Sequence, residues 1–91
     1  MNAFEEASDW TEPIEIASRS FRLGIEAMGS EHLKRFIDCL SPVVKTLPSD
    51  TMQRLAAILS ESFASQARKD FSYLADLLEY RIIPLLEEAN R

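Results

Sequence analysis

The segment from Phe71 to Arg91 predicts one long helix that is apolar over more of its circumference than a surface helix needs. At about 100° per residue, its main apolar face carries Phe71, Leu74, Ala75, Leu78, Ile82, Leu85, Leu86 and Ala89. A second apolar stripe beside it carries Tyr73, Leu77, Tyr80 and Pro84. The polar strip is narrow and consists of Ser72, Asp76, Glu79, Glu87 and Asn90. A helix with so little polar surface is expected to contact partners on two sides.

The chain has 91 residues, which is the size of one domain. A domain this small buries only about two thirds of its unfolded surface, so association with another chain would add useful stability. Residues 1–10 show no periodic apolar pattern and predict a flexible N-terminal tail. Residues 11–91 predict a single helical domain. We therefore expect part of the surplus apolar surface to meet another chain.

Few residues break helices here, since the chain has two glycines and four prolines and is rich in Leu, Ala and Glu. Helical periodicity predicts four helices, which span residues 12–28, 31–47, 50–67 and 70–89. Helices of similar length with short links favour an all-α, antiparallel four-helix bundle.

Capping signals set the expected boundaries of the first two helices. Thr11 is the expected N-cap of the first helix, and Gly29 the expected left-handed residue after its end. Ser30 is then the expected N-cap of the second helix. Within the first helix, Arg22 and Glu26 are opposite charges four residues apart, a spacing that favours an ion pair.

The third and fourth helices have their own start signals. Asp50 and Gln53 have the spacing of a capping box. Asp70 is the expected N-cap of the last helix, although no glycine or proline marks the turn before it. Arg68 and Lys69 suit a helix C-terminus, so we place the turn at residues 68–70, with its exact position left open.

Two prolines fall inside predicted helices, and each removes a backbone donor and crowds the preceding turn. We expect kinks at Pro42 and Pro84. At Pro42 a second possibility stays open, in which the helix breaks and a new one starts at Ser41.

Charge and cysteine content exclude several classes of function. The net charge is −5 and the basic residues are dispersed among acids, so we expect no nucleic-acid binding. The longest apolar cluster is far shorter than a membrane span, so we expect no membrane insertion. Cys39 is the only cysteine, so no internal disulfide can form and a reducing, cytoplasmic location is expected.

No residue pattern predicts catalysis, a metal or a cofactor. His32 has no second ligand at bundle-site spacing, and Cys39 has no nearby base. Asp76 and Glu79 lie one turn apart but on the polar strip, where a solvated pair or contact with a basic partner is expected instead of acid–base chemistry. We predict that the protein is not an enzyme.

The strongest sequence candidate is a surface made of apolar residues left over once one core face is filled. On the first helix these residues are Ile16, Leu23 and Ala27, and on the last helix Tyr73, Leu77 and Tyr80. Tyrosine is common at interfaces because it buries a large ring and keeps a polar tip. We predict that these six residues form an interface between chains. The alternative, that both stripes pack within one chain, stays open.

The run from Asp70 to Tyr80, with Pro84-Leu85-Leu86 after it, resembles the C-terminal segment of small uncharacterised bacterial helical proteins. This resemblance implies a bacterial, cytoplasmic protein and brings no known chemistry. In size and acidity the chain is also similar to small secretion chaperones of the flagellar type.

These observations favour a small protein–protein interaction module that forms a homodimer. It could also serve as an adaptor or chaperone for a partner's amphipathic helix. The alternatives are a small-molecule-binding bundle with a pocket around Tyr73 and Tyr80, and a regulatory subunit that does not contact DNA. The sequence specifies neither the partner nor the biological process.

Overall fold

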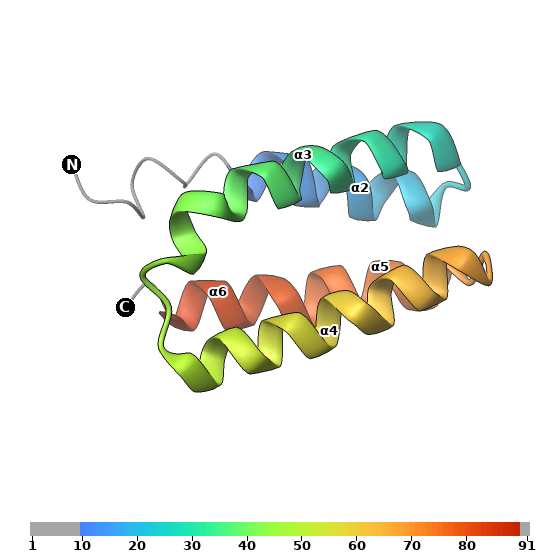
Figure 1. Cartoon of the computed structure of the whole chain (residues 1–91). Coiled ribbons are helices and arrows are strands. Elements are labelled where there is room, and N and C mark those ends of the chain that lie inside the picture. The colour runs from blue at the N-terminus through green and yellow to red at the C-terminus, as the bar shows by residue number, and fades with distance from the viewer. Residues whose placement is uncertain (1–9, 90–91) are drawn as a thin grey trace.

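The leucine- and alanine-rich segments of the chain form helices in the computed structural model, which describes residues 10–89 (Figure 1). Within these residues the protein is all-helical. The elements are α2 (Thr11–Arg22), α3 (Glu26–Val44), α4 (Ser49–Ala67), α5 (Phe71–Asp76), the π-helix η2 (Leu77–Ile82) and α6 (Ile83–Ala89). Since α5, η2 and α6 follow one another without a break, they make a single C-terminal helix, and the described residues contain four helices in total.

The C-terminal helix lies between α2 and α4. Its α5 and η2 parts contact α2 on one flank and α4 on the other, and α2 packs along α3. Figure 1 shows α2 beside α3 in one layer and α4 beside the C-terminal helix in the other. The all-helical fold class is thereby confirmed, while the antiparallel bundle arrangement remains part of the proposal below.

The core is made of large aliphatic side chains and the buried rings of Trp10, Phe21 and Phe36, with the half-buried ring of Phe71 packed against them. Phe21 of α2 stacks on Phe71 of α5, with ring centroids 5.4 Å apart. Trp10 meets the ring of Phe36 edge-on at 6.1 Å and is only 3% exposed. Trp10 is therefore part of the core, because its indole is buried against Phe36 of α3. The predicted tail is wrong at this residue, and residues 1–9 lie outside the described part of the chain.

The first helix ends at Arg22, earlier than the predicted residue 28. Gly24 has φ of +76°, the left-handed conformation that glycine adopts without steric cost. The N–H of Gly24 donates to the carbonyl of Phe21, and the N–H of Ile25 donates to that of Ser20. This pair of bonds is a Schellman motif, so Gly24 has the capping role predicted for Gly29.

The second helix consequently starts at Glu26 and not at residue 31. Gly29 and Ser30, predicted to punctuate the chain, both lie inside α3. Gly29 is buried, and a Cβ atom built on it would come within 2.8 Å of the Phe21 ring. Its lack of a side chain thus serves close helix packing and not a turn.

The helix α3 continues through Pro42 to Val44, so it does not restart at Ser41. The predicted kink at Pro42 is not confirmed.

The third helix agrees with its prediction within one residue, although no capping bond from Asp50 forms there. At the start of the first helix, Trp10 and not Thr11 is the residue before the first turn, and it forms no side-chain cap.

The turn between α4 and α5 lies at residues 68–70, where the sequence places it. The Asp70 carboxylate accepts from the N–H of Tyr73 at 3.4 Å, which confirms Asp70 as an N-cap. Lys69 has φ of 61° in this turn, and its N–H donates to the carbonyl of Gln66. A lysine therefore occupies the left-handed position that glycine favours at helix ends.

The π-helix η2 directly precedes the predicted kink at Pro84. A proline ring clashes with the carbonyl one α-turn before it, here that of Tyr80. In η2 the bonds span five residues, as from the N–H of Ile83 to the carbonyl of Leu78. This wider turn relieves crowding before Pro84. The sharp bend itself is not confirmed.

Candidate functional site

The six predicted interface residues do not come together on one surface. Leu23 and Ala27 are exposed at the turn between α2 and α3, and Ile16 is half-buried on α2. Tyr80 is 66% exposed, whereas Leu77 is 2% exposed and belongs to the core. The prediction is wrong for Leu77 because the C-terminal helix has neighbours on two flanks, α2 and α4, within one chain. Of its second stripe, Leu77 is buried within the chain, while Tyr73, Tyr80 and Pro84 stay exposed.

Tyr73, the remaining predicted residue, is directed toward α4. Its hydroxyl donates to the carboxylate of Glu61, and this contact raises the pKa of Tyr73 above its ordinary value. The ring thereby links α5 to α4 within the chain. Tyr73 is at most a rim residue of any interface.

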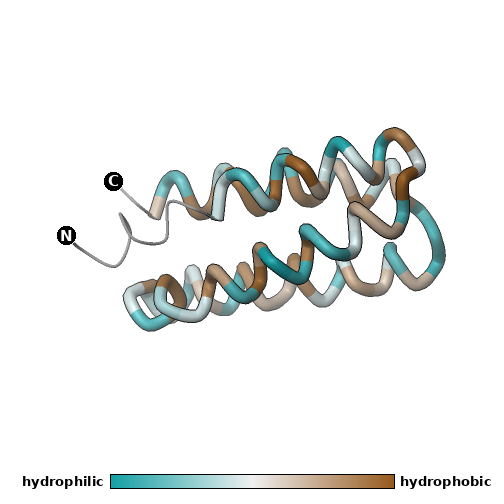
Figure 2. The backbone as a smooth tube through the Cα atoms, turned by 90° about the horizontal axis from the view of Figure 1, so that it is seen from above, coloured by the Kyte–Doolittle hydropathy of each residue, from teal (hydrophilic) through white to brown (hydrophobic). Residues whose placement is uncertain are grey.

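An apolar turn between α2 and α3 is the most exposed hydrophobic feature of the described chain. Leu23 is 69% exposed, and Ile25 and Met28 are each 46% exposed. With the exposed Ala27, they place four apolar residues within six positions, and we call these four the tip patch. Figure 2 shows hydrophobic backbone segments at this end of the molecule. A run of exposed apolar residues works against solubility unless it has a role.

The tip patch is held in place by contacts with the turn between α4 and α5. Lys69 forms an ion pair with Glu26 at 3.0 Å, and the Gln66 amide donates to the Ser30 hydroxyl at 2.8 Å. Glu26 therefore binds Lys69 and not the predicted partner Arg22. These two contacts join the start of α3 to the end of α4. They hold the tip patch in a defined position, with the charges of Glu26 and Lys69 beside it.

A polar cluster binds the other side of α2 to the C-terminal helix. Arg22 contacts Asp76 at 2.8 Å and Glu79 at 3.1 Å, and the Ser18 hydroxyl also donates to Glu79. The Arg22 guanidinium, and then Ser18, hold the pKa of Glu79 below its ordinary value. Arg22 also lies 6.0 Å from the centre of the Tyr80 ring.

The two carboxylates of this cluster are thus structural, not merely solvated as predicted. Because Arg22 and Ser18 lower the pKa of Glu79, this carboxylate is poorly suited to act as a general acid at neutral pH. The cluster fixes the register of α2 against α5 and η2. Sequence reasoning missed it because its partners lie more than fifty residues apart.

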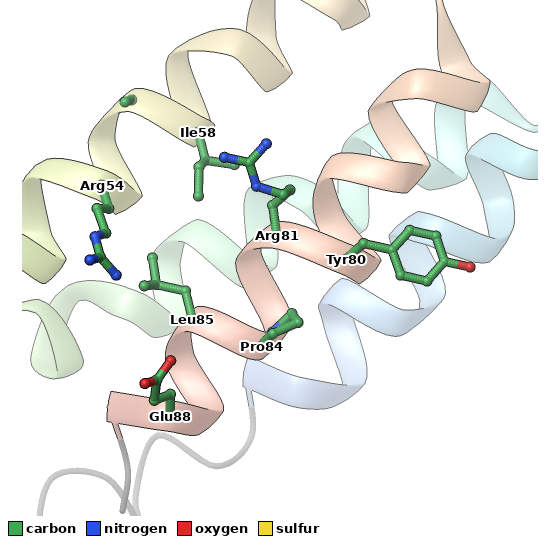
Figure 3. A pocket seen from close by; sticks show the side chains of 8 residues that line it. Arg54, Ile58, Tyr80, Arg81, Pro84, Leu85 and Glu88 are labelled. Atoms are coloured by element: carbon green, nitrogen blue, oxygen red, sulfur yellow. The ribbon is translucent and has the colours of Figure 1, made fainter.

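A surface hollow of about 440 Å³ lies between α4 and the C-terminal helix (Figure 3). Arg54, Ala57 and Ile58 line it from α4. The opposite wall includes Arg81, Leu85 and Glu88. Figure 3 shows Ile58 and Leu85 between the two arginines, and Tyr80 directed away from Arg54. Tyr80 also lines the hollow, as the predicted ligand pocket required, but Tyr73 does not.

His32 and Cys39 line a second hollow, between α2 and α3. The His32 ring nitrogen Nδ1 lies 3.0 Å from the carbonyl oxygen of Met28, and Cys39 is half-buried. Within residues 10–89 no group of three or more His, Cys, Asp or Glu side chains is arranged to hold a metal. Neither residue shows a feature that points to chemistry.

None of the helices in the described range 10–89 is long and apolar enough to cross a membrane. The chain matches no family model, and no curated protein and no solved structure is similar enough to count as a relative. The arrangement of its own residues is therefore the basis of the functional proposal.

Proposed function

We propose that this protein is a small helical protein–protein interaction module that self-associates through the tip patch. One observation supports the proposal above all. Leu23, Ile25 and Met28 are large, apolar and between 46% and 69% exposed within six residues of one turn. Burying such side chains against another chain contributes about 25 cal/mol for each Å² of apolar surface removed from water.

A second copy is the partner that this surface fits best. Glu26 and Lys69 flank the tip patch and carry opposite charges. In a two-fold dimer the same surface faces itself, so Glu26 of one copy can approach Lys69 of the other, and the reverse. Apolar residues at the centre with paired charges at the rim match the usual anatomy of an interface.

The proposal also includes three predictions from the sequence: the arrangement of the helices, the bends at the prolines, and the bacterial, cytoplasmic origin. We take the helices as an antiparallel up-down-up-down bundle, bent at Pro42 and Pro84, in a bacterial, cytoplasmic protein. The adaptor or chaperone role, with an amphipathic helix of another protein on the same surface, is the competing occupant.

Sedimentation equilibrium tests the proposal directly. Wild type is expected to be dimeric at micromolar concentrations. The double variant Leu23→Ser, Met28→Ser is expected to be a folded monomer, because both side chains are exposed and outside the core. Tyr80→Ser is the control, since Tyr80 is 66% exposed but belongs to η2 and not to the tip patch, and this variant should remain dimeric. A wild type that stays monomeric up to millimolar concentration overturns self-association.

A charge exchange tests the predicted geometry. Glu26→Lys and Lys69→Glu should each weaken the dimer, since each places like charges together at the rim. An equimolar mixture of the two variants should dimerise again, because every contact between the two chains at this rim then pairs opposite charges. If the mixture is as weak as each variant alone, the two-fold contact through the tip patch is wrong.

A further inference from the structure

The hollow in Figure 3 combines positive charge with an apolar floor in an acidic protein. Its lining contains two arginines and one glutamate, so its formal charge is positive, while that of the whole chain is −5. Arg54 comes from α4 and Arg81 from η2. Neither forms an ion pair with another side chain of residues 10–89, whereas Arg22 binds two carboxylates. Among the residues that the structure describes, both guanidinium groups are therefore open to an anion from outside the chain.

The rest of the lining is apolar. Ile58 is buried and Leu85 is half-buried. The side chain of Ala57 is a single methyl group, so it occupies little of the space in the hollow. The volume of about 440 Å³ lies within the range typical of small-molecule sites. A ligand must therefore offer apolar surface to the floor and negative charge at the rim.

We propose that this hollow binds a small amphipathic carboxylate, with both Arg54 and Arg81 attracting its carboxylate and with its hydrocarbon part over Ile58 and Leu85. A guanidinium matches a carboxylate by two parallel N–H donors, which favours this anion over a compact, strongly hydrated one. Glu88 at the same rim disfavours a second negative charge on the ligand, so a monocarboxylate fits better than a dicarboxylate. This site is separate from the tip patch, so the inference is independent of self-association.

Octanoate is the test ligand, followed by chemical-shift changes in ¹⁵N-labelled full-length protein at constant ionic strength. The expected result is saturable binding, with changes centred on residues 54–58 and 81–88. Octan-1-ol and acetate supply the chain or the charge alone, and each should bind at least about tenfold more weakly. If octan-1-ol binds as well as octanoate, the role of the arginines is wrong. If acetate binds as well, the apolar floor is not used.

Matched variants locate the site. Arg54→Gln and Arg81→Gln should each weaken octanoate binding by about fivefold, since each removes a charge-assisted donor. Arg35→Gln, an equal change of charge on α3, should leave the affinity unchanged because Arg35 lies outside this hollow.

A second pair of variants tests the shape of the hollow without changing its charge. Ala57→Leu should fill the wall and weaken octanoate binding, while Ala56→Leu should have no effect. Both alanines are exposed on α4, but only Ala57 lines the hollow. Equal effects of the two variants, or an unsaturable response of the wild type to octanoate, would overturn the proposal.

Discussion

Gly29 of α3 lies against the ring of Phe21 of α2 so closely that a Cβ atom at Gly29 would be 2.7 Å from Phe21 Cε1. This contact allows α2 and α3 to pack along each other just after the Schellman turn at Gly24. The tip patch lies on that turn, so its position depends on the same contact.

Gly29→Ala should therefore destabilise the protein by about 1–2 kcal/mol, because the cost of overpacking exceeds the gain in helix propensity. Urea unfolding measures the change. In a Phe21→Leu background the ring is absent, so the same alanine should be neutral or stabilising. An equal loss of stability in both backgrounds would mean that the contact with Phe21 is not the cause.

Lys69→Gly should stabilise the protein by up to about 1 kcal/mol, because φ of 61° is strained for lysine and free for glycine. Lys69→Ala is the control, since it also loses the ion pair with Glu26 but keeps a Cβ atom. The melting temperature should rank the glycine variant above the alanine variant. Equal melting temperatures of the two variants would contradict backbone strain at this turn.

Low pH should destabilise the protein partly through Glu79. The folded-state pKa of Glu79 lies below its ordinary value of 4.5, because Arg22 and Ser18 donate to the carboxylate. Its stabilisation is therefore fully present above pH 4.5 and is lost as the pH falls through the lowered folded pKa. Glu79→Gln should flatten this acid limb in thermal melts between pH 7 and 2. Glu87→Gln, at an exposed carboxylate, should keep the wild-type slope.

Trp10 should report a buried environment, since it is the only tryptophan and is 3% exposed. Its fluorescence should be blue-shifted in the native state and shift to the red on unfolding. Trp10→Ala should cost about 3 kcal/mol. Trp10→Phe should cost less, because it removes a buried indole N–H that has no hydrogen-bond partner among residues 10–89. A red-shifted emission of the native protein would instead support the prediction that Trp10 belongs to a flexible N-terminal tail.

Two residues of the same predicted stripe should respond in opposite ways to a glutamate. Leu77→Glu places a charge in the core and should unfold the protein. Tyr80→Glu should leave it folded, since this side chain is 66% exposed. Circular dichroism distinguishes the two outcomes. A folded Leu77→Glu variant would restore the view that Leu77 faces outward.

The sequence predicted the number and kind of helices because apolar periodicity and capping are local properties. It placed the third helix within one residue and identified Asp70 as a cap. It assigned the wrong glycine to the first turn, because both Gly24 and Gly29 directly follow an apolar residue and only packing distinguishes them. Gly29 is needed beside Phe21, and that leaves the left-handed position to Gly24.

The amino-acid sequence alone determined that this chain is helical, that it carries surplus apolar surface, and that Leu23 and Ala27 lie beyond the core. The tertiary structure decided which surplus residues remain exposed, because the C-terminal helix has α2 on one flank and α4 on the other. Leu77 is buried by that placement, while Arg54 and Arg81 are brought to one hollow from distant segments. Contacts between such distant residues depend on how helices pack, and no local pattern in the sequence encodes them.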